Sequence, residues 1–337
     1  MDPQLLLDNL LSPPVLFFLV GVGATLLRSD LSIPEPIAKL FSLYLLWAIG
    51  YKGGVKLHEA GFDADVLVPL GVALALSTLT PLWVFPALRR NLGAADAAAC
   101  AAAFGSVSAV TFITAANFLE ANDIPYGGYM VAALALMEAP AIIVAVMFYR
   151  RWQRTHEARD AIDGESLDAA PAAAPPAGGV LALLRESVLS GPVFLLLGSM
   201  LVGLLAGPRG YERLLPFTED VFYGVLVLFL LEAGMVAAKR LRSLGGAGVF
   251  TVAAGVVIPI INAAITWPIT KLLGLEIGDA FLLMILAASA SYIAVPAAMR
   301  LTIPQASPGV YLTVALGITF PFNIAIGIPL YLWVLGG

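Results

Sequence analysis

The sequence has few of the residues that make disulfides, metal centres and catalytic sites. Its one cysteine is Cys100 and it has two histidines, so an intramolecular disulfide and a cysteine-based zinc site are both excluded. It contains no glycine-rich phosphate loop, and no nucleophile stands in a recognisable pattern with a base. We therefore expect no enzyme, no ATP-driven pump, no cofactor and no nucleic-acid partner.

Charge is also scarce. Asp, Glu, Lys and Arg make up 12% of the chain, whereas hydrophobic residues make up 60%. A typical soluble domain is about 25% charged. The mean hydropathy is +0.92, and long runs without a charge recur along the sequence. Such runs are typical of helices that cross a bilayer, so the predicted fold class is an all-α polytopic membrane protein.

The apolar runs predict ten transmembrane helices of about 20 residues each. They lie near residues 13–28, 34–51, 66–88, 96–119, 127–149, 188–207, 221–238, 247–274, 279–299 and 310–335. A polar stretch that becomes rich in alanine and proline follows the fifth helix. It divides the chain into a first five-helix repeat over 1–149, a flexible cytoplasmic linker over 150–184 and a second five-helix repeat over 185–337.

The distribution of basic residues predicts the orientation. If the linker is cytoplasmic, most of the 18 Lys and Arg residues fall on the inner side of the membrane. Both termini then lie outside a plasma (inner) membrane. Because each unit has an odd number of helices, the second unit enters the membrane in the opposite sense. We therefore predict two inverted repeats of five helices.

Two of the predicted helices are weakened at their centres. The run over 97–119 carries glycine and hydroxyl residues, and the run over 280–298 carries serines and a proline. FGSVSAV (104–110) aligns with AASASYI (287–293), which superposes the two interruptions. Two crossing discontinuous helices at matching places are typical of a transporter binding site.

The ends of the half-helices suggest the chemistry of this site. Amino ends with free N–H groups favour an anion, and carboxyl ends with free carbonyls favour Na⁺. The candidate substrate-binding residues are Gly105, Ser106, Val107, Ser108, Ser289, Ala290, Ser291 and Tyr292. The alternative is that these small residues allow helices to pack closely.

An intramembrane carboxylate adds a candidate ion site. Glu138 lies in the middle of a predicted helix, two residues before Pro140, where a charge is costly and usually functional. The candidate ion-binding residues are Thr111, Glu138, Thr319 and Asn323. For Glu138 the alternative is a structural hydrogen bond at a Pro140 kink, and for Asn323 it is a place on a helix interface.

Several stretches carry a family resemblance. They are FGSVSAVTFITAANFLEANDIPY (104–126), MEAPAIIVA (137–145), RESVLSGPVFLLLGSMLVG (185–203), AASASYIAVPAAMRLTIPQASPGVY (287–311) and FPFNIAIGIPLY (320–331). Their order and spacing resemble the sodium-dependent bicarbonate transporter (SbtA-like) family. The resemblance implies bicarbonate symport with Na⁺, elevator-type alternating access between a core and a gate domain, a homotrimer, and a PII-like regulator on the cytoplasmic face.

The resemblance also implies site residues. The first interruption matches the family at Gly105, Val107, Ser108 and Thr111, and the second at Ser289, Ser291, Ile293 and Pro296. Glu138 stands where the family pattern has Asp. The chain departs from the pattern at Tyr292 in place of Asp, Ala294 in place of Ser, and Ala109 and Val110 in place of Gly and Ser. These departures remove an acid and two hydroxyls from the expected anion and sodium sites.

The function predicted from these observations is secondary active transport of a small anion, bicarbonate first, driven by Na⁺ or H⁺. One alternative is another small organic anion or carboxylate, which a wide apolar cavity lined by Phe112, Tyr292 and Phe322 would favour. Another is a membrane sensor that does not transport. Membrane lipid is a further expected partner, since arginines at the start of the linker offer contacts to anionic lipid or an acidic protein, although such residues also mark topology.

Overall fold

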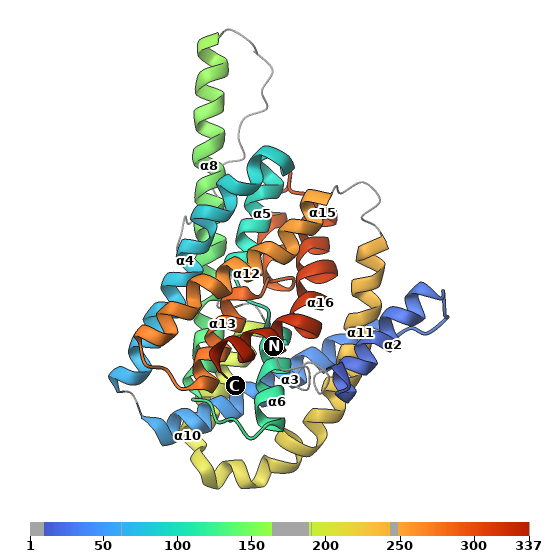
Figure 1. Cartoon of the computed structure of the whole chain (residues 1–337), viewed down its shortest axis with the longest axis vertical. Coiled ribbons are helices and arrows are strands. Elements are labelled where there is room, and N and C mark those ends of the chain that lie inside the picture. The colour runs from blue at the N-terminus through green and yellow to red at the C-terminus, as the bar shows by residue number, and fades with distance from the viewer. Residues whose placement is uncertain (1–9, 62, 164–188, 190, 243–248, 337) are drawn as a thin grey trace.

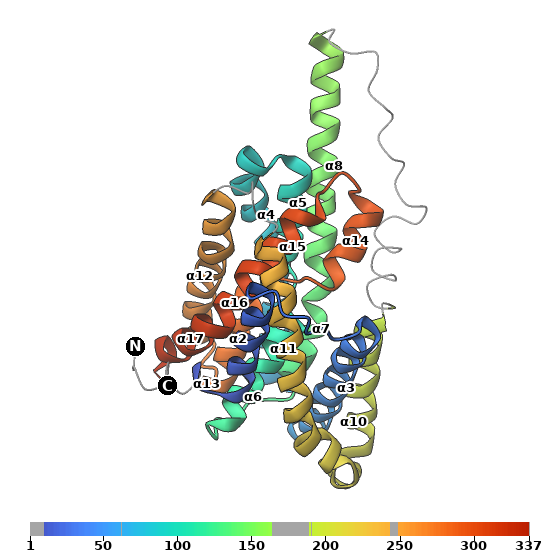
Figure 2. The ribbon, with the colours of Figure 1, turned by 90° about the vertical axis from the view of Figure 1, so that its right-hand side faces the viewer.

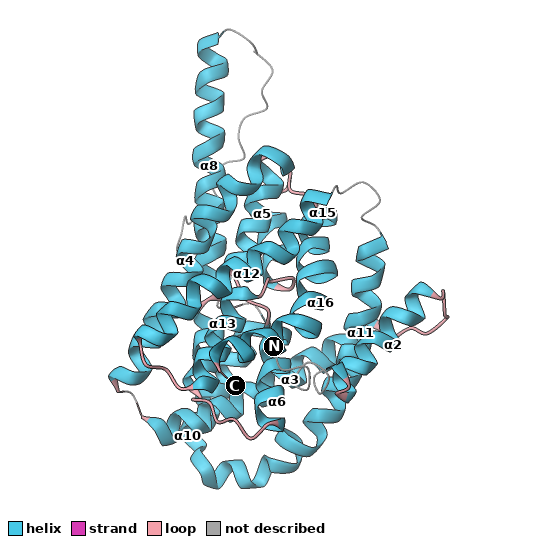
Figure 3. Cartoon of the chain, viewed as in Figure 1, coloured by secondary structure: helices cyan, strands magenta, loops and turns pink. Residues whose placement is uncertain are grey.

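The computed structural model describes residues 10–61, 63–163, 189, 191–242 and 249–336 (Figure 1). Within these ranges the regular structure is entirely helical (Figure 3), as the sequence predicts. Six helical segments have the length and apolarity to cross a membrane. They are Ala64–Leu92, Ala94–Ala121, Tyr129–Thr155, Gly191–Arg242, Val249–Leu272 and Pro308–Leu335.

The first half of the chain forms seven of the described helices. They are α2 (Pro13–Leu26), α3 (Glu35–Ala60), α4 (Ala64–Leu92), α5 (Ala94–Gly105), α6 (Ala109–Ala121), α7 (Tyr129–Leu136) and α8 (Glu138–Asp163). The α3 helix continues well past its predicted end at residue 51, because Lys52 is buried and paired there rather than exposed at a helix end. The α8 helix continues to Asp163 and projects beyond the other helices (Figure 1), so the start of the predicted linker is helical. The rest of that linker lies outside the described residues.

The second half of the chain is also helical in its described residues. It contains α10 (Gly191–Leu215), η1 (Pro216–Asp220), α11 (Val221–Arg242), α12 (Val249–Leu272), α13 (Ile277–Ala288), α14 (Ala294–Thr302), α15 (Pro308–Leu312), η2 (Thr313–Thr319), α16 (Phe320–Phe322), η3 (Asn323–Gly327) and α17 (Ile328–Leu335). The η segments are π-helical turns. The α10 helix bends at Gly207, which has a φ of 58°. Glycine adopts such a positive φ readily, whereas most other residues rarely do.

Two reciprocal helix pairs connect the halves. The α2 helix packs on α11 and α3 packs on α10 (Figure 2). Each pair crosses at glycines that face the partner's backbone. A Cβ added to Gly21 or Gly234 would lie 2.0 or 2.1 Å from a carbonyl oxygen across the α2–α11 contact. At the α3–α10 contact the same distances are 2.0 Å for Gly54 and 2.2 Å for Gly203. Only glycine permits backbones to approach this closely.

The remaining helices surround the two interruptions. The α5 helix consists almost wholly of alanine and other small residues, so α4 and α8 pack closely around it, and its side chains are buried. Both predicted interruptions are present, since α5 ends at Gly105 before α6 begins, and α13 ends at Ala288 before α14 begins. The first break is buried throughout, and the second is buried over residues 289–291.

Candidate functional site

The first break depends on Gly105. A Cβ at this position would lie 2.8 Å from the Ala141 Cβ and 2.8 Å from the Pro81 Cδ, so α5 reaches the centre of the molecule only with glycine at its end. Ser108 then begins α6, because its Oγ accepts a hydrogen bond from the Thr111 amide at 3.2 Å. This is a side-chain cap on one of the amides that a helix start leaves without a partner.

The second break is tied to the first by two hydrogen bonds. The Ser108 amide donates to the Ser289 Oγ at 2.9 Å, and Ser289 in turn donates to the Leu286 carbonyl at 2.9 Å. The Ser291 amide donates to the Ala103 carbonyl at 2.8 Å. Each break therefore satisfies a buried backbone group of the other, and the two lie side by side.

Pro296 serves a different purpose from the one its sequence position suggests. It lies in the first turn of α14, which begins at Ala294. An amide in the first turn of a helix has no intrahelical acceptor, so proline costs little there. Pro296 therefore belongs to the start of α14, and the break itself lies over residues 289–293.

Two asparagines hold the end of α13. The side-chain amide of Asn262 donates a hydrogen bond to the Ala287 carbonyl at 2.9 Å, and the side-chain amide of Asn323 donates one to the Ala288 carbonyl at 2.8 Å. The Asn323 Oδ1 also accepts a hydrogen bond from the Tyr331 hydroxyl at 3.3 Å. In the sequence, Asn262 stands in an apolar stretch near Pro259, and no local pattern there indicates that it supports the break.

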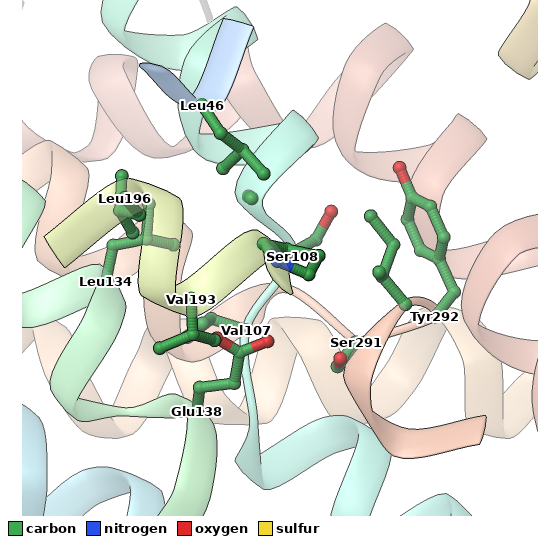
Figure 4. A pocket seen from close by; sticks show the side chains of 12 residues that line it. Leu46, Val107, Ser108, Leu134, Glu138, Val193, Leu196, Ser291 and Tyr292 are labelled. Atoms are coloured by element: carbon green, nitrogen blue, oxygen red, sulfur yellow. The ribbon is translucent and has the colours of Figure 1, made fainter. Parts of the chain in front are cut away.

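A cavity of about 20 Å³ lies where the two breaks meet (Figure 4). Such a volume suits a species of about the size of a water molecule. Its walls are Leu46, Val107, Ser108, Ala109, Leu134, Glu138, Pro192, Val193, Leu196, Ser291, Tyr292 and Ile293. The wall includes Ser108 and Ala109 at the start of α6 and Ile293 immediately before α14, so the amino ends of two helices lie beside the cavity.

Among the described residues, Glu138 provides the only charged side chain in the cavity wall. It begins α8 after a break at Met137, whose carbonyl accepts a hydrogen bond from the Ser77 hydroxyl at 2.6 Å. Pro140 therefore lies in the first turn of α8, and the predicted helix over 127–149 is divided just before Glu138. Within the described residues the Glu138 carboxylate makes no hydrogen bond or ion pair, which argues against the structural alternative.

Three buried hydroxyl oxygens around the breaks make no hydrogen bond within the described residues. They belong to Ser106, Thr111 and Tyr292. A buried polar atom without a partner costs free energy, so each such atom calls for an explanation. A ligand that is bound for part of a working cycle is one such explanation.

The predicted site residues thus separate into groups. Val107, Ser108, Ser291, Tyr292 and Glu138 line one cavity. Gly105, Ser106, Thr111, Ser289 and Ala290 are buried next to it and shape the breaks. Thr319 and Asn323 lie outside the cavity wall, and the Thr319 hydroxyl donates to the Gly255 carbonyl at 2.7 Å.

No cluster of three or more His, Cys, Asp and Glu side chains suited to a metal ion occurs in the described ranges. In a comparison with protein families, the model described as the Na⁺-dependent bicarbonate transporter superfamily matches residues 13–336. No curated protein matches the chain significantly.

Proposed function

The chain belongs to the Na⁺-dependent bicarbonate transporter superfamily, and we propose that it carries bicarbonate across the plasma membrane by symport with Na⁺. Membership of a transporter family implies a multi-pass membrane protein that is not an enzyme. The observation that supports a bound anion most directly is the cavity between the starts of α6 and α14. Two helix starts directed at one small cavity favour one small anion over a cation.

Bicarbonate suits the polar groups of this cavity. It is a planar anion whose oxygens accept hydrogen bonds, and the free amides of α6 and α14 together with the Ser108, Ser291 and Tyr292 hydroxyls can donate them. The larger organic anion that the sequence left open finds less support. At about 20 Å³ the cavity is too small for such an anion, and neither Phe112 nor Phe322 is part of its wall. Bicarbonate is itself larger than a water molecule, so its binding would require the walls of the cavity to move apart.

Na⁺ would bind beside the anion. The Ser106 and Thr111 hydroxyl oxygens are buried without hydrogen-bond partners in the described residues, and such oxygens are suited to a hard cation. Glu138 would balance the cation charge. We infer that Thr319 and Asn323 act indirectly, since their hydrogen bonds hold the helices around α13.

The element order supports ten membrane crossings as two inverted repeats. The series α2, α3, α4, α5–α6, α7–α8 corresponds to α10, α11, α12, α13–α14, α15–α17. The first helix of each series packs on the second helix of the other, at glycines in both contacts. With the linker in the cytoplasm, both termini would then lie outside.

An elevator movement would carry the cavity past a fixed scaffold. The helices α2, α3, α10 and α11 pack mainly on one another, whereas the breaks belong to the other helices. The buried Lys52 of α3 bridges this boundary, since its Nζ lies 2.9 Å from Glu120 at the end of α6 and 3.1 Å from Glu219. We propose that the Lys52–Glu120 pair separates during transport. On the family resemblance, we also propose that the protein forms a homotrimer and that a PII-like protein binds its cytoplasmic face.

Uptake of radiolabelled bicarbonate into proteoliposomes tests this function. We expect accumulation under an inward Na⁺ gradient, at least tenfold slower accumulation in Ser291→Ala and Glu138→Gln, and normal accumulation in Thr78→Ala. Thr78 is a matched control because its exposed hydroxyl bonds only to the Leu74 carbonyl of its own helix. Uptake that survives collapse of both the Na⁺ and H⁺ gradients would refute symport. Bicarbonate binding without any uptake would favour the membrane sensor.

A further inference from the structure

In Figure 1, α8 leaves the helical bundle beside the turn between α4 and α5. A second, larger cavity is lined by residues of these helices. Its volume is about 610 Å³, within the range of small-molecule sites. Its walls are Phe85, Arg89, Arg90, Ala94, Phe148, Arg151, Trp152 and Thr155. None of these residues lines the cavity at the breaks, so the two cavities have separate walls.

The charge of this cavity has one sign. Arg89, Arg90 and Arg151 line it, and among the described residues no acidic side chain is part of its wall. In the described part of the chain none of the three makes an ion pair or side-chain hydrogen bond. Arg89 and Arg90 lie in the last turn of α4, where the partial negative charge of the helix end stabilises a cation. Arg151 lies within α8 and has no helix end to stabilise its charge. Three guanidinium groups around one space repel each other and favour a multiply charged anion.

The remaining walls are apolar or aromatic. Phe85 is buried, and Phe148 and Trp152 are partly buried between α4 and α8. Both helices belong to segments that can cross a membrane, and the cavity lies where their apolar sequence gives way to arginine. Just inside this boundary, Leu82 is 40% exposed and Met147 is 57% exposed. Tryptophan and arginine at the end of a spanning segment are typical of the headgroup level of a bilayer.

We propose that this cavity binds the headgroup of an anionic phospholipid. The arginines would hold phosphate oxygens, for which a planar guanidinium is better suited than an ammonium group. Trp152 and Phe148 would contact the glycerol region, and the acyl chains would lie along the exposed apolar side chains of α4 and α8. Ala94 is part of the wall and begins α5, which ends at Gly105 beside the first break. A bound headgroup would therefore stabilise the helix that forms one side of the site.

Native mass spectrometry of the full chain, with lipids added in a nonionic detergent, tests the proposal. We expect at least tenfold more retained phosphatidylglycerol or cardiolipin than phosphatidylcholine. The combined variant Arg89→Gln, Arg90→Gln and Arg151→Gln should lose this preference. The matched control is Arg28→Gln, Arg154→Gln and Arg213→Gln, which removes three exposed arginines outside the cavity wall and should keep it. Arg154 is on the same helix as Arg151.

Three outcomes would overturn the proposal. Equal loss in both triple variants would mean that lipid binds through overall charge alone. Displacement of the lipid by millimolar inorganic phosphate or glycerol phosphate would mean that the site takes a soluble phosphate compound. Equal retention of anionic and zwitterionic lipid would mean that the arginines do not select a headgroup. Thermal unfolding without added lipid checks that each variant is folded, and the count of bound lipids is independent of any transport activity.

Discussion

The two breaks differ in ways that their similar sequences conceal. The first, over residues 106–108, is buried throughout and leads into an α6 helix of 13 residues with a side-chain cap from Ser108. The second, over residues 289–293, leads into an α14 helix of 9 residues without a side-chain cap, and Ile293 is 37% exposed. The first break is thus enclosed and capped by a side chain, whereas the second is partly exposed and has no such cap.

This difference suggests that the two breaks have different roles in binding the anion. The first break would fix the position of the bound anion, because Ser108 is held by Ser289 and itself holds the start of α6. The second would determine which anion fits, because Tyr292 reaches the cavity from it and departs from the family pattern. Variants on the two sides should therefore affect stability and selectivity to different extents.

The largest expected effect is the loss of stability in Gly105→Val. The added side chain would collide with Ala141 and Pro81, and overpacking of this kind costs about 3 kcal/mol at its upper range. Thermal unfolding in detergent measures it. Gly71→Val is the matched control, since a Cβ at Gly71 has no neighbour within 4 Å. The aligned position in the second break is Ala288, which already has a Cβ. If Gly105→Val were as stable as Gly71→Val, the proposed difference between the two breaks would be contradicted.

Ser289→Ala should have the next largest effect. It leaves the buried Ser108 amide without its acceptor, which costs about 2 kcal/mol. Ser291→Ala is the control, because the bond from Ser291 to the Ala103 carbonyl comes from its backbone and persists. We expect a lower unfolding temperature only in Ser289→Ala, and slower bicarbonate uptake in both. A stable Ser289→Ala protein would show that the two breaks are not coupled through this bond.

Removing the cap on α6 should have a smaller effect. Ser108→Ala loses the bond to the Thr111 amide, and such a cap contributes about 1 kcal/mol. Ile293→Val, at the start of α14, removes one methyl group of a partly exposed side chain and no capping bond. Chemical denaturation of both variants measures the difference. If Ile293→Val costs more than Ser108→Ala, the asymmetry between the breaks is wrong.

The smallest effect on stability is expected for Tyr292→Phe. Its hydroxyl makes no hydrogen bond within the described residues, so removing it breaks no bond and should not lower the free energy of unfolding. If the hydroxyl donates to bicarbonate, the apparent KM should rise about two- to tenfold, which is the cost of one hydrogen bond. Tyr223→Phe, an exposed site, is the control. An unchanged KM would remove Tyr292 from the site.

The sequence predicted where the two breaks lie better than it predicted which residues contact one another around them. Glycine and serine within an apolar run are local signals, and both breaks lie where those signals are found. The length of α3 was not predictable, because Lys52 remains in a helix only with Glu120 and Glu219 nearby, and both are distant in sequence. The roles of Thr319 and Asn323 were not predictable either. Their side chains could bind an ion, but in the fold they donate hydrogen bonds to the Gly255 and Ala288 carbonyls, which are distant in sequence.

The most direct test of the central claim is a density map of the full chain at saturating bicarbonate and Na⁺. We expect density for a planar anion in the cavity between Ser108 and Ser291, within hydrogen-bond distance of the first amides of α6 and α14. A map without bicarbonate should lack it, and so should a map of Ser291→Ala at the same concentration. Density for the anion at another position, with this cavity empty at saturation, would contradict the account.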